Sequence, residues 1–358
     1  MRFLRYDSSI HYYRRLAPPL IFIVVFYLQL VPLSFAESDP SVVGVIHNLI
    51  RQVKKEIPPL DLSKKPTPSP ASVSYFQYSD LYYAHPHHYF GTFWSDDYAI
   101  AAHIFAPLKS HGTVFLLHGY FDHTGILKNL IRHCLDSGLA VACFDLPGHG
   151  LSTGQRGAIE DFSQYVSVLE NFIKICSGRL QQPYYLIGHS LGSSIALEYI
   201  FNGNSQNPVF KKVILLAPLI HYSYYQISRL QYPLLKSFVV NIPRGTPNNS
   251  SDPVFVDWLK QDPLQGKQIP IGWLRALYEW NDRIENYGSV STPLLVIQGT
   301  RDRVIDWRYN IKLLKEKCDS LTVKWIENGR HQLLNESRHL REEVLLAISS
   351  YLEIHAQP

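Results

Sequence analysis

Little net charge and few cysteines are the first features of this 358-residue chain. Its 34 basic and 30 acidic residues leave a formal net charge of +4. Residues 1–36 contain four arginines and one aspartate, so they carry most of this excess. A chain that is close to neutral elsewhere gives no reason to expect a nucleic-acid partner.

The four cysteines have no spacing that indicates a disulfide framework or a zinc site. One of them lies in an apolar run typical of a buried strand. No cysteine follows the N-terminal apolar run closely, so lipid attachment at a mature N-terminus is unsupported. We therefore expect free, buried thiols at Cys134, Cys143, Cys176 and Cys318.

The N-terminus has the order of a targeting segment. Arg14 and Arg15 precede an apolar run from Leu16 to Leu33, and small residues end it at Ala36. This order predicts a secretory signal over residues 1–36, which would export the chain to the periplasm or the medium. The run is also about as long as a membrane span, so an uncleaved anchor is the alternative.

Residues 37–88 differ in composition from the rest of the chain. Apolar positions predict a short amphipathic helix over 37–53, and the prolines of 57–70 predict an extended segment, because proline cannot continue a helix. The run His85-Pro86-His87-His88 suggests a metal, but adjacent histidines ahead of an edge strand are more typical of a solvated loop. We interpret 37–88 as an N-terminal arm and proline-rich linker.

From residue 89 onward, short apolar runs alternate with helical stretches. A hairpin comes first, and the later runs lack polar alternation, as expected for strands buried on both faces of a parallel sheet. The pattern predicts an α/β fold with a mostly parallel sheet, helices on both faces and two core parts, 89–217 and 291–358. The expected strands are Thr113–Leu117, Leu139–Phe144, Tyr184–Ile187, Val213–Leu216, Leu294–Ile297 and Leu321–Ile326, and the expected helices cover about 124–137, 158–177, 190–202, 306–317 and 336–354.

Residues 218–290 interrupt this alternation. They contain no expected sheet strand but many large apolar side chains, including Trp258, Trp273 and Trp280. A structureless loop of this length is improbable in a compact domain, so we expect a mostly helical insertion. Because open α/β sheets bind ligands at the carboxyl ends of their strands, we expect the insertion to cap that edge.

The segment Gly188-His189-Ser190-Leu191-Gly192 lies between an expected strand and an expected helix. This context is typical of a nucleophile elbow, a sharp turn that has room only for glycine on its flanks. The turn would place Ser190 at a helix N-terminus, where the helix dipole favours developing negative charge. The alternative is a glycine-bounded turn with a passive serine.

A serine hydroxyl needs a base to remove its proton, and a carboxylate orients that base. Asp302 and His331 each directly follow a later expected strand, at the same sheet edge as Ser190. Asp306 competes with Asp302, but it lies a helical turn later and is typical of a helix cap.

An oxyanion needs backbone donors. We expect one from the amide of Leu191 and the other from the loop that begins His118-Gly119. Tyr120 is the preferred donor in that loop, with Phe121 as the alternate.

Together these segments resemble the monoacylglycerol lipase and lysophospholipase group of α/β hydrolases, over about residues 89–355. The resemblance implies an α/β-hydrolase fold, a triad of Ser190, Asp302 and His331, oxyanion amides at Tyr120 and Leu191, and no metal or organic cofactor. The matching segments are His118-Gly119 with Asp122-His123-Thr124, Phe144–Ser152, Gly188–Gly192, Gly299–Asp302, Gly329–His331 and the pair Asp262-Pro263.

The expected function is hydrolysis of single-acyl lipid esters, monoacylglycerols or lysophospholipids, through an acyl-enzyme. An esterase, thioesterase or peptidase with the same triad is the alternative, since the fold does not choose between them. A non-enzymatic binding protein would typically lack a triad member, and none is missing here. The expected partners are a lipid or other ester and a membrane surface contacted by the insertion or the N-terminus.

Overall fold

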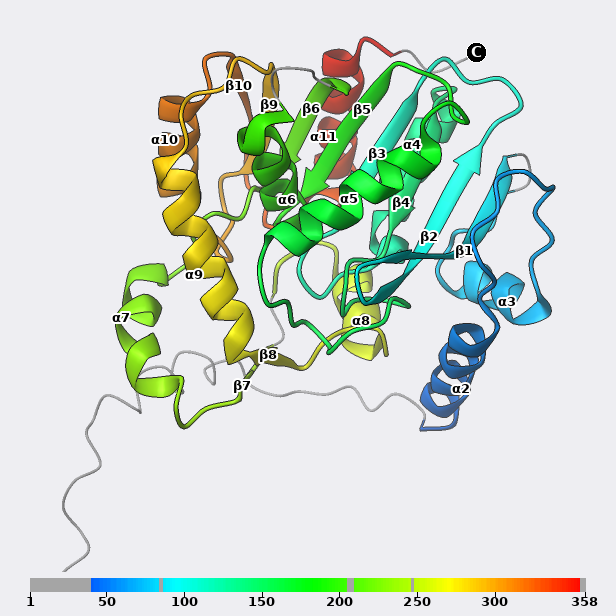
Figure 1. Ribbon diagram of the computed structural model, residues 1–358, viewed down its shortest axis with the longest axis horizontal. Helices are drawn as coiled ribbons and strands as arrows, with labels where there is room; N and C mark the ends of the chain where they lie inside the picture. The colour runs from blue at the N-terminus through cyan, green and yellow to red at the C-terminus, as the bar shows by residue number, and fades with distance from the viewer. Residues whose placement is uncertain (1–39, 84–85, 205–208, 246–247, 355–358) are drawn as a thin grey trace, which may run out of the picture. The chain divides into compact units, whose positions relative to one another are not determined.

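The computed structural model describes residues 40–83, 86–204, 209–245 and 248–354 (Figure 1). The predicted signal or anchor segment, residues 1–36, lies outside these ranges. Within them, no helix is both long enough and apolar enough to cross a membrane.

Eight strands form the main sheet of the described chain, in the order β1-β2-β4-β3-β5-β6-β9-β10. The first two pairings are antiparallel and all the later ones are parallel, so the sheet is mostly parallel, as predicted. The strands are β1 (His87–Ser95), β2 (Tyr98–Ala106), β3 (Thr113–Leu117), β4 (Ala140–Phe144), β5 (Tyr184–His189), β6 (Phe210–Leu216), β9 (Leu294–Gly299) and β10 (Leu321–Ile326).

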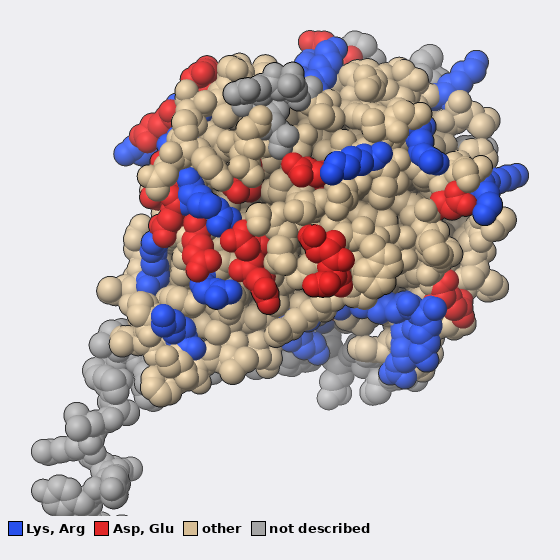
Figure 2. Space-filling view, viewed as in Figure 1, with Lys and Arg blue, Asp and Glu red and all other residues tan. Residues whose placement is uncertain are grey.

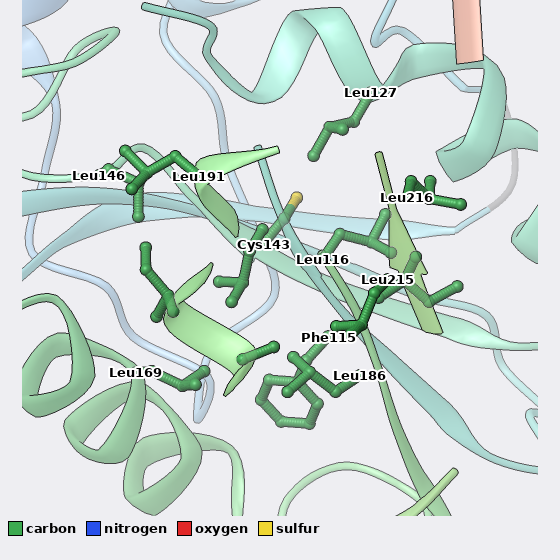
Figure 3. Close-up of a cluster of buried hydrophobic side chains, with 14 of the residues drawn as sticks. Phe115, Leu116, Leu127, Cys143, Leu146, Leu169, Leu186, Leu191, Leu215 and Leu216 are labelled. Atoms are coloured by element: carbon green, nitrogen blue, oxygen red, sulfur yellow. The ribbon is translucent and has the colours of Figure 1, made fainter. Parts of the chain in front are cut away.

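The apolar runs predict these strands because the central ones are buried on both faces. Every residue of β3, β4, β5 and β9 is buried. Figure 3 shows side chains of neighbouring strands meeting in this core, among them Phe115, Leu186 and Leu215. The edge strand β10 is the exception, since Trp325 is 39% exposed.

Helices cover both faces of the sheet. Figure 1 shows α5 and α6 in front of the sheet and α11 behind it. A hydrogen bond of 2.6 Å between His133 and Ser349 joins α4 to α11 on the rear face. These helices are α4 (Lys128–Asp136), α5 (Ser163–Cys176), α6 (Leu191–Tyr199), α10 (Trp307–Lys317) and α11 (Arg338–Leu352).

Residues 37–88 are more than an arm and linker, and this corrects the sequence prediction. The predicted helix is present as α2 (Pro40–Glu56), and the segment after it is extended and pairs with β1 through Thr92. The unpredicted helix α3 (Pro70–Tyr78) buries Tyr75 and Phe76 in the main core. The sequence sets the start of α3 locally, because the side chain of Ser69 caps the helix by accepting a hydrogen bond from the amide of Ser72.

The histidine-rich run is also not a solvated loop. His87 and His88 belong to β1, and His85 lies outside the described residues. The ring of His88 lies 4.1 Å from that of Phe105 and forms a 2.9 Å hydrogen bond with His103. Among the described residues, no three or more potential ligands gather into a metal site.

The insertion between β6 and β9 is mostly helical, as predicted. Its elements are α7 (Tyr225–Leu235), β7 (Asn241–Pro243), α8 (Pro253–Gln261), β8 (Gln268–Pro270) and α9 (Ile271–Asn286), with β7 and β8 forming a small antiparallel ribbon. It packs on the loop after β3, where Trp273 stacks on Tyr120 and Asp262 bonds to His123. The four cysteines are free and buried, as predicted.

Candidate active site

Ser190 occupies a sharp turn between β5 and α6. Its backbone has a φ of 51° and a ψ of −112°, which a non-glycine residue rarely adopts. A Cβ on Gly188 would lie 2.4 Å from the carbonyl of Gly192, and one on Gly192 would lie 2.3 Å from the carbonyl oxygen of Leu117. Both flanking positions therefore require glycine, for the steric reason that the elbow pattern implies.

The structure brings the three predicted side chains into one line. His331 Nε2 lies 2.9 Å from Ser190 Oγ, and His331 Nδ1 lies 2.8 Å from Asp302 Oδ2. Each of the three residues is 5% exposed, so bulk water is largely kept from the line. With Nδ1 donating to the carboxylate, Nε2 is left as the acceptor that faces the serine hydroxyl.

The carboxylate of Asp302 is held ionised by its neighbours. Burial raises its pKa, but the charge and hydrogen bond of His331 and the amides of Val304 and Ile305 outweigh burial, so the pKa is lowered overall. Those two amides donate to Oδ1 at 2.8 and 3.3 Å. The competitor Asp306 instead caps α10 by accepting a hydrogen bond from the amide of Tyr309.

A second buried pair supports the loop that carries His331, and local sequence patterns did not indicate it. His189 Nε2 donates to the backbone carbonyl of His331 at 3.0 Å, and its Nδ1 lies 3.5 Å from Asp122. Asp122 also accepts from Gln332 Nε2 at 3.0 Å. Both His189 and Asp122 lie in segments that carry the family resemblance, so the resemblance could have indicated a role for them in the site.

The loop after β3 lies directly beside the serine. A Cβ on Gly119 would lie 3.3 Å from the Cβ of Ser190. The amide of Asp122 donates to the carbonyl of Gly119, which makes Tyr120 and Phe121 the two central residues of a tight turn. Leu191 is the first residue of α6, where an amide has no acceptor within its own helix. The predicted oxyanion residues are thus on the two segments next to Ser190.

The other motif residues brace these loops. The amide of Leu146 donates to His118 Nε2, which leaves His118 Nδ1 to donate to the carbonyl of Gly119. Asp145 accepts hydrogen bonds from the amides of Thr124 and Leu151 at 2.8 and 2.7 Å. His118 and Asp145 therefore hold the loops of the site in place through hydrogen bonds to the backbone.

Comparison with known proteins relates the chain to hydrolases. Residues 109–338 match the family described as serine aminopeptidase, S33. Human monoglyceride lipase is 27% identical over 255 residues, which cover 67% of this chain and 81% of that protein. Phospholipase YtpA of Bacillus subtilis is 26% identical over 254 residues, which cover 67% of this chain and 94% of that protein.

Solved structures with a similar fold include a monoglyceride lipase. A soluble variant of monoglyceride lipase from Saccharomyces cerevisiae, solved in complex with a substrate analog, superposes with a TM-score of 0.64. It is 20% identical, and the match covers 76% of this chain and 96% of that one. Since the family match spans more than half of the chain, the protein belongs to the serine aminopeptidase S33 family of α/β hydrolases, as a monoacylglycerol lipase-like serine ester hydrolase.

Proposed function

We propose that this enzyme hydrolyses the ester bond of single-acyl lipids, monoacylglycerols or lysophospholipids, through an acyl-enzyme on Ser190. The observation that carries the proposal is the hydrogen-bonded line from Ser190 Oγ through the His331 ring to Asp302. Such a line lets the imidazole take the serine proton while the carboxylate stabilises the imidazolium that forms.

In the first half-reaction, Ser190 Oγ bonds to the ester carbonyl carbon as its proton passes to His331 Nε2. The carbonyl oxygen becomes an oxyanion that the amides of Leu191 and Tyr120 stabilise, with Phe121 as the alternate donor. The ester C–O bond then breaks, and the leaving alcohol takes the proton from His331. In the second half-reaction, His331 deprotonates a water that bonds to the acyl carbon. The bond from that carbon to Ser190 Oγ then breaks, Oγ takes the proton back from His331, and the fatty acid leaves.

A lipid substrate is supported by the insertion and by the relatives. The loop beside Ser190 meets aromatic side chains of the insertion, including Trp273, and apolar burial stabilises an acyl chain by about 25 cal/mol per Å². Monoglyceride lipases and a phospholipase are among the proteins that the chain resembles over most of their length.

Contact with a membrane surface is part of the same proposal. Apolar side chains of α7 and the segment after it face solvent, and three of them repeat at the helical spacing of one face. Their exposed fractions are 50% for Ile227, 80% for Leu230, 69% for Leu234, 88% for Phe238 and 72% for Val240. We infer that this face touches the lipid surface and that residues 1–36 export the chain or anchor it there. The mass of the mature N-terminus distinguishes export from anchoring.

The alternative is an esterase, thioesterase or peptidase acting on a non-lipid substrate. The family description names an aminopeptidase, and the same line of side chains serves all of these reactions.

The test compares the wild type with Ser190→Ala on monoacylglycerol, lysophospholipid, aminoacyl-anilide and p-nitrophenyl esters of increasing chain length. The lipid proposal expects long acyl chains to be preferred and Ser190→Ala to lose hydrolysis and fluorophosphonate labelling. Undiminished hydrolysis by the variant refutes the assignment of Ser190, and preference for acetate or for anilides favours the alternative.

A further inference from the structure

An arginine of the insertion stacks on the loop beside Ser190. Arg244 follows β7, and its guanidinium carbon lies 4.6 Å from the centroid of the Phe121 ring. Phe121 is the neighbour of Tyr120 and is 2% exposed. One aromatic ring therefore separates this cation from the loop that lines the nucleophile.

The donors of Arg244 are only partly used. Nη1 donates to the side chain of Gln265 at 2.9 Å and to the carbonyl of Gly266 at 3.3 Å. Over the described residues, Nε and Nη2 form no hydrogen bond, and these two donors point the same way along one side of the guanidinium. Such a pair of parallel donors fits two oxygens of a phosphate.

A second arginine, Arg156, adjoins a glycine that contacts Tyr120 and Phe121. Tyr120 Oη donates to the carbonyl of Gly157 at 2.7 Å, and a Cβ on Gly157 would lie 2.6 Å from the Phe121 ring. The preceding residue, Arg156, reaches only the carbonyls of Gly148 and Gly150, at the long distance of 3.5 Å. Its guanidinium is therefore also without a strong partner.

A lysine of α2, Lys54, carries a further positive charge in the last turn of that helix. Burial and the charge of Arg156 lower the pKa of Lys54, and the charge of Asp145 raises it. Arg156 and Arg244 form the cationic rim, and neither has a carboxylate within ion-pair distance in the described chain. Figure 2 shows basic side chains gathered over α2.

The acidic groups near the cationic rim are already engaged. Asp145 accepts backbone amides, Asp262 pairs with His123, and Asp122 accepts from Gln332. Burial lowers the pKa values of Arg156 and Arg244 by more than the charge of Asp262 and other nearby acidic groups raises them. A partly buried arginine that keeps unused donors beside an active site fits a ligand of opposite charge.

We propose that the cationic rim binds a phosphate carried by the substrate, so that the preferred substrate is an anionic lysophospholipid rather than a neutral monoacylglycerol. This inference rests on the proposed lipid esterase function and selects between its two substrate classes. The ester carbonyl would lie at Ser190, and the phosphate on the glycerol would face Arg244.

The test measures kcat/KM on lysophosphatidylglycerol and on monoacylglycerol with the same acyl chain. The wild type should favour the anionic lipid, and Arg244→Gln should reduce the ratio of the two kcat/KM values about tenfold, the size expected for one lost charged hydrogen bond. Arg244→Lys keeps the charge but loses the paired donors, so its ratio of kcat/KM values should lie between those of the wild type and Arg244→Gln. Arg156→Gln should reduce the ratio in the same direction.

Arg275→Gln is the matched control, since Arg275 lies on α9 of the same insertion and its side chain is 51% exposed. It should leave the ratio unchanged. Glycerol 3-phosphate should inhibit p-nitrophenyl butyrate hydrolysis by the wild type more strongly than inorganic phosphate does, and Arg244→Gln should weaken that inhibition.

The outcomes separate the two proposals. A wild type that hydrolyses neither lipid overturns the proposed function itself. A wild type that hydrolyses monoacylglycerol as well as the anionic lipid, with a ratio unmoved by Arg244→Gln, overturns only the phosphate assignment. Fluorophosphonate labelling of each variant verifies that Ser190 remains reactive and the protein folded.

Discussion

The indole of Trp273 lies on the phenol ring of Tyr120, with ring centroids 3.8 Å apart and planes inclined by 18°. Trp273 belongs to α9 of the insertion and is 4% exposed, whereas Tyr120 belongs to the turn beside Ser190. The far end of the Tyr120 side chain is held as well, because its hydroxyl donates to the carbonyl of Gly157. The insertion therefore fixes the position of a residue whose amide we propose as an oxyanion donor.

Trp273→Ala should lower kcat on a soluble ester about tenfold and change KM less, because a displaced Tyr120 amide weakens transition-state stabilisation. It should also lower the free energy of unfolding by about 3 kcal/mol, as buried tryptophan truncations do. Trp273→Phe keeps a ring on Tyr120 and should recover most of kcat. Steady-state kinetics and urea unfolding check both effects, and a full kcat in stable Trp273→Ala would show that the stacking does not matter for catalysis.

Asp302→Asn should reduce kcat about ten-thousandfold while the protein stays folded, because the His331 ring loses the carboxylate that orients and stabilises it. The matched control is Asp306→Asn, which alters only the cap of α10 and should keep activity with about 1 kcal/mol or less lost in unfolding free energy. Equal losses in the two variants would contradict the assignment of the acid.

The lowered pKa of Asp302 also gives a pH dependence. Because the folded pKa lies below the ordinary value of 3.8, the carboxylate stabilises the fold above that pH, and the contribution is lost as the pH falls through the folded pKa. Urea unfolding between about pH 5 and 2 should show a smaller acid loss in Asp302→Asn than in the wild type.

Leu230→Glu and Phe238→Glu should weaken binding to phospholipid vesicles about tenfold, since each removes an apolar side chain that would enter the lipid surface. Hydrolysis of a soluble short-chain ester should remain at the wild-type rate. Leu108→Glu is the control, because Leu108 is 86% exposed but precedes the amino end of β3, on the opposite edge of the sheet. Vesicle sedimentation measures binding, and an equal effect of all three substitutions would contradict a specific docking face.

The buried pair of His88 and His103 should make the fold sensitive to acid. Burial lowers the pKa of His103 to about 4 and that of His88 well below its usual range, so both rings are neutral in the folded protein. Their contribution is complete above pH 6.5 and is lost as the pH falls toward 4, because the unfolded chain binds the protons first. His103→Gln should flatten the fall of the urea midpoint between pH 7 and 4, whereas His339→Gln, at an exposed position, should not. An unchanged slope in His103→Gln would contradict the assigned role of this ring.

Local patterns predicted the parts of the fold that depend on neighbours in the chain. The run Thr113–Leu117 coincides with β3, because consecutive apolar residues indicate a strand that packs in the core. The run Leu321–Ile326 coincides with β10, an edge strand in which only Ile326 is buried. The elbow at Ser190 was equally predictable, since the steric need for glycine acts over two residues on either side. Helix α3 was missed because its sequence lacks a clear amphipathic period and its two buried aromatic residues find their partners on distant strands.

The amino-acid sequence alone established three features of the protein. These are the order of strands and helices, the elbow, and the two residues after strand ends that meet Ser190. Parallel strands bring their carboxyl ends to one edge, so position along the chain was enough to place those residues together. Their surroundings emerged only from the folded chain: Trp273 on Tyr120, His189 beside Asp122, and Arg244 over Phe121. These contacts join separate segments of the chain, and no local spacing encodes them, because they depend on how the insertion and the loops pack back onto the sheet.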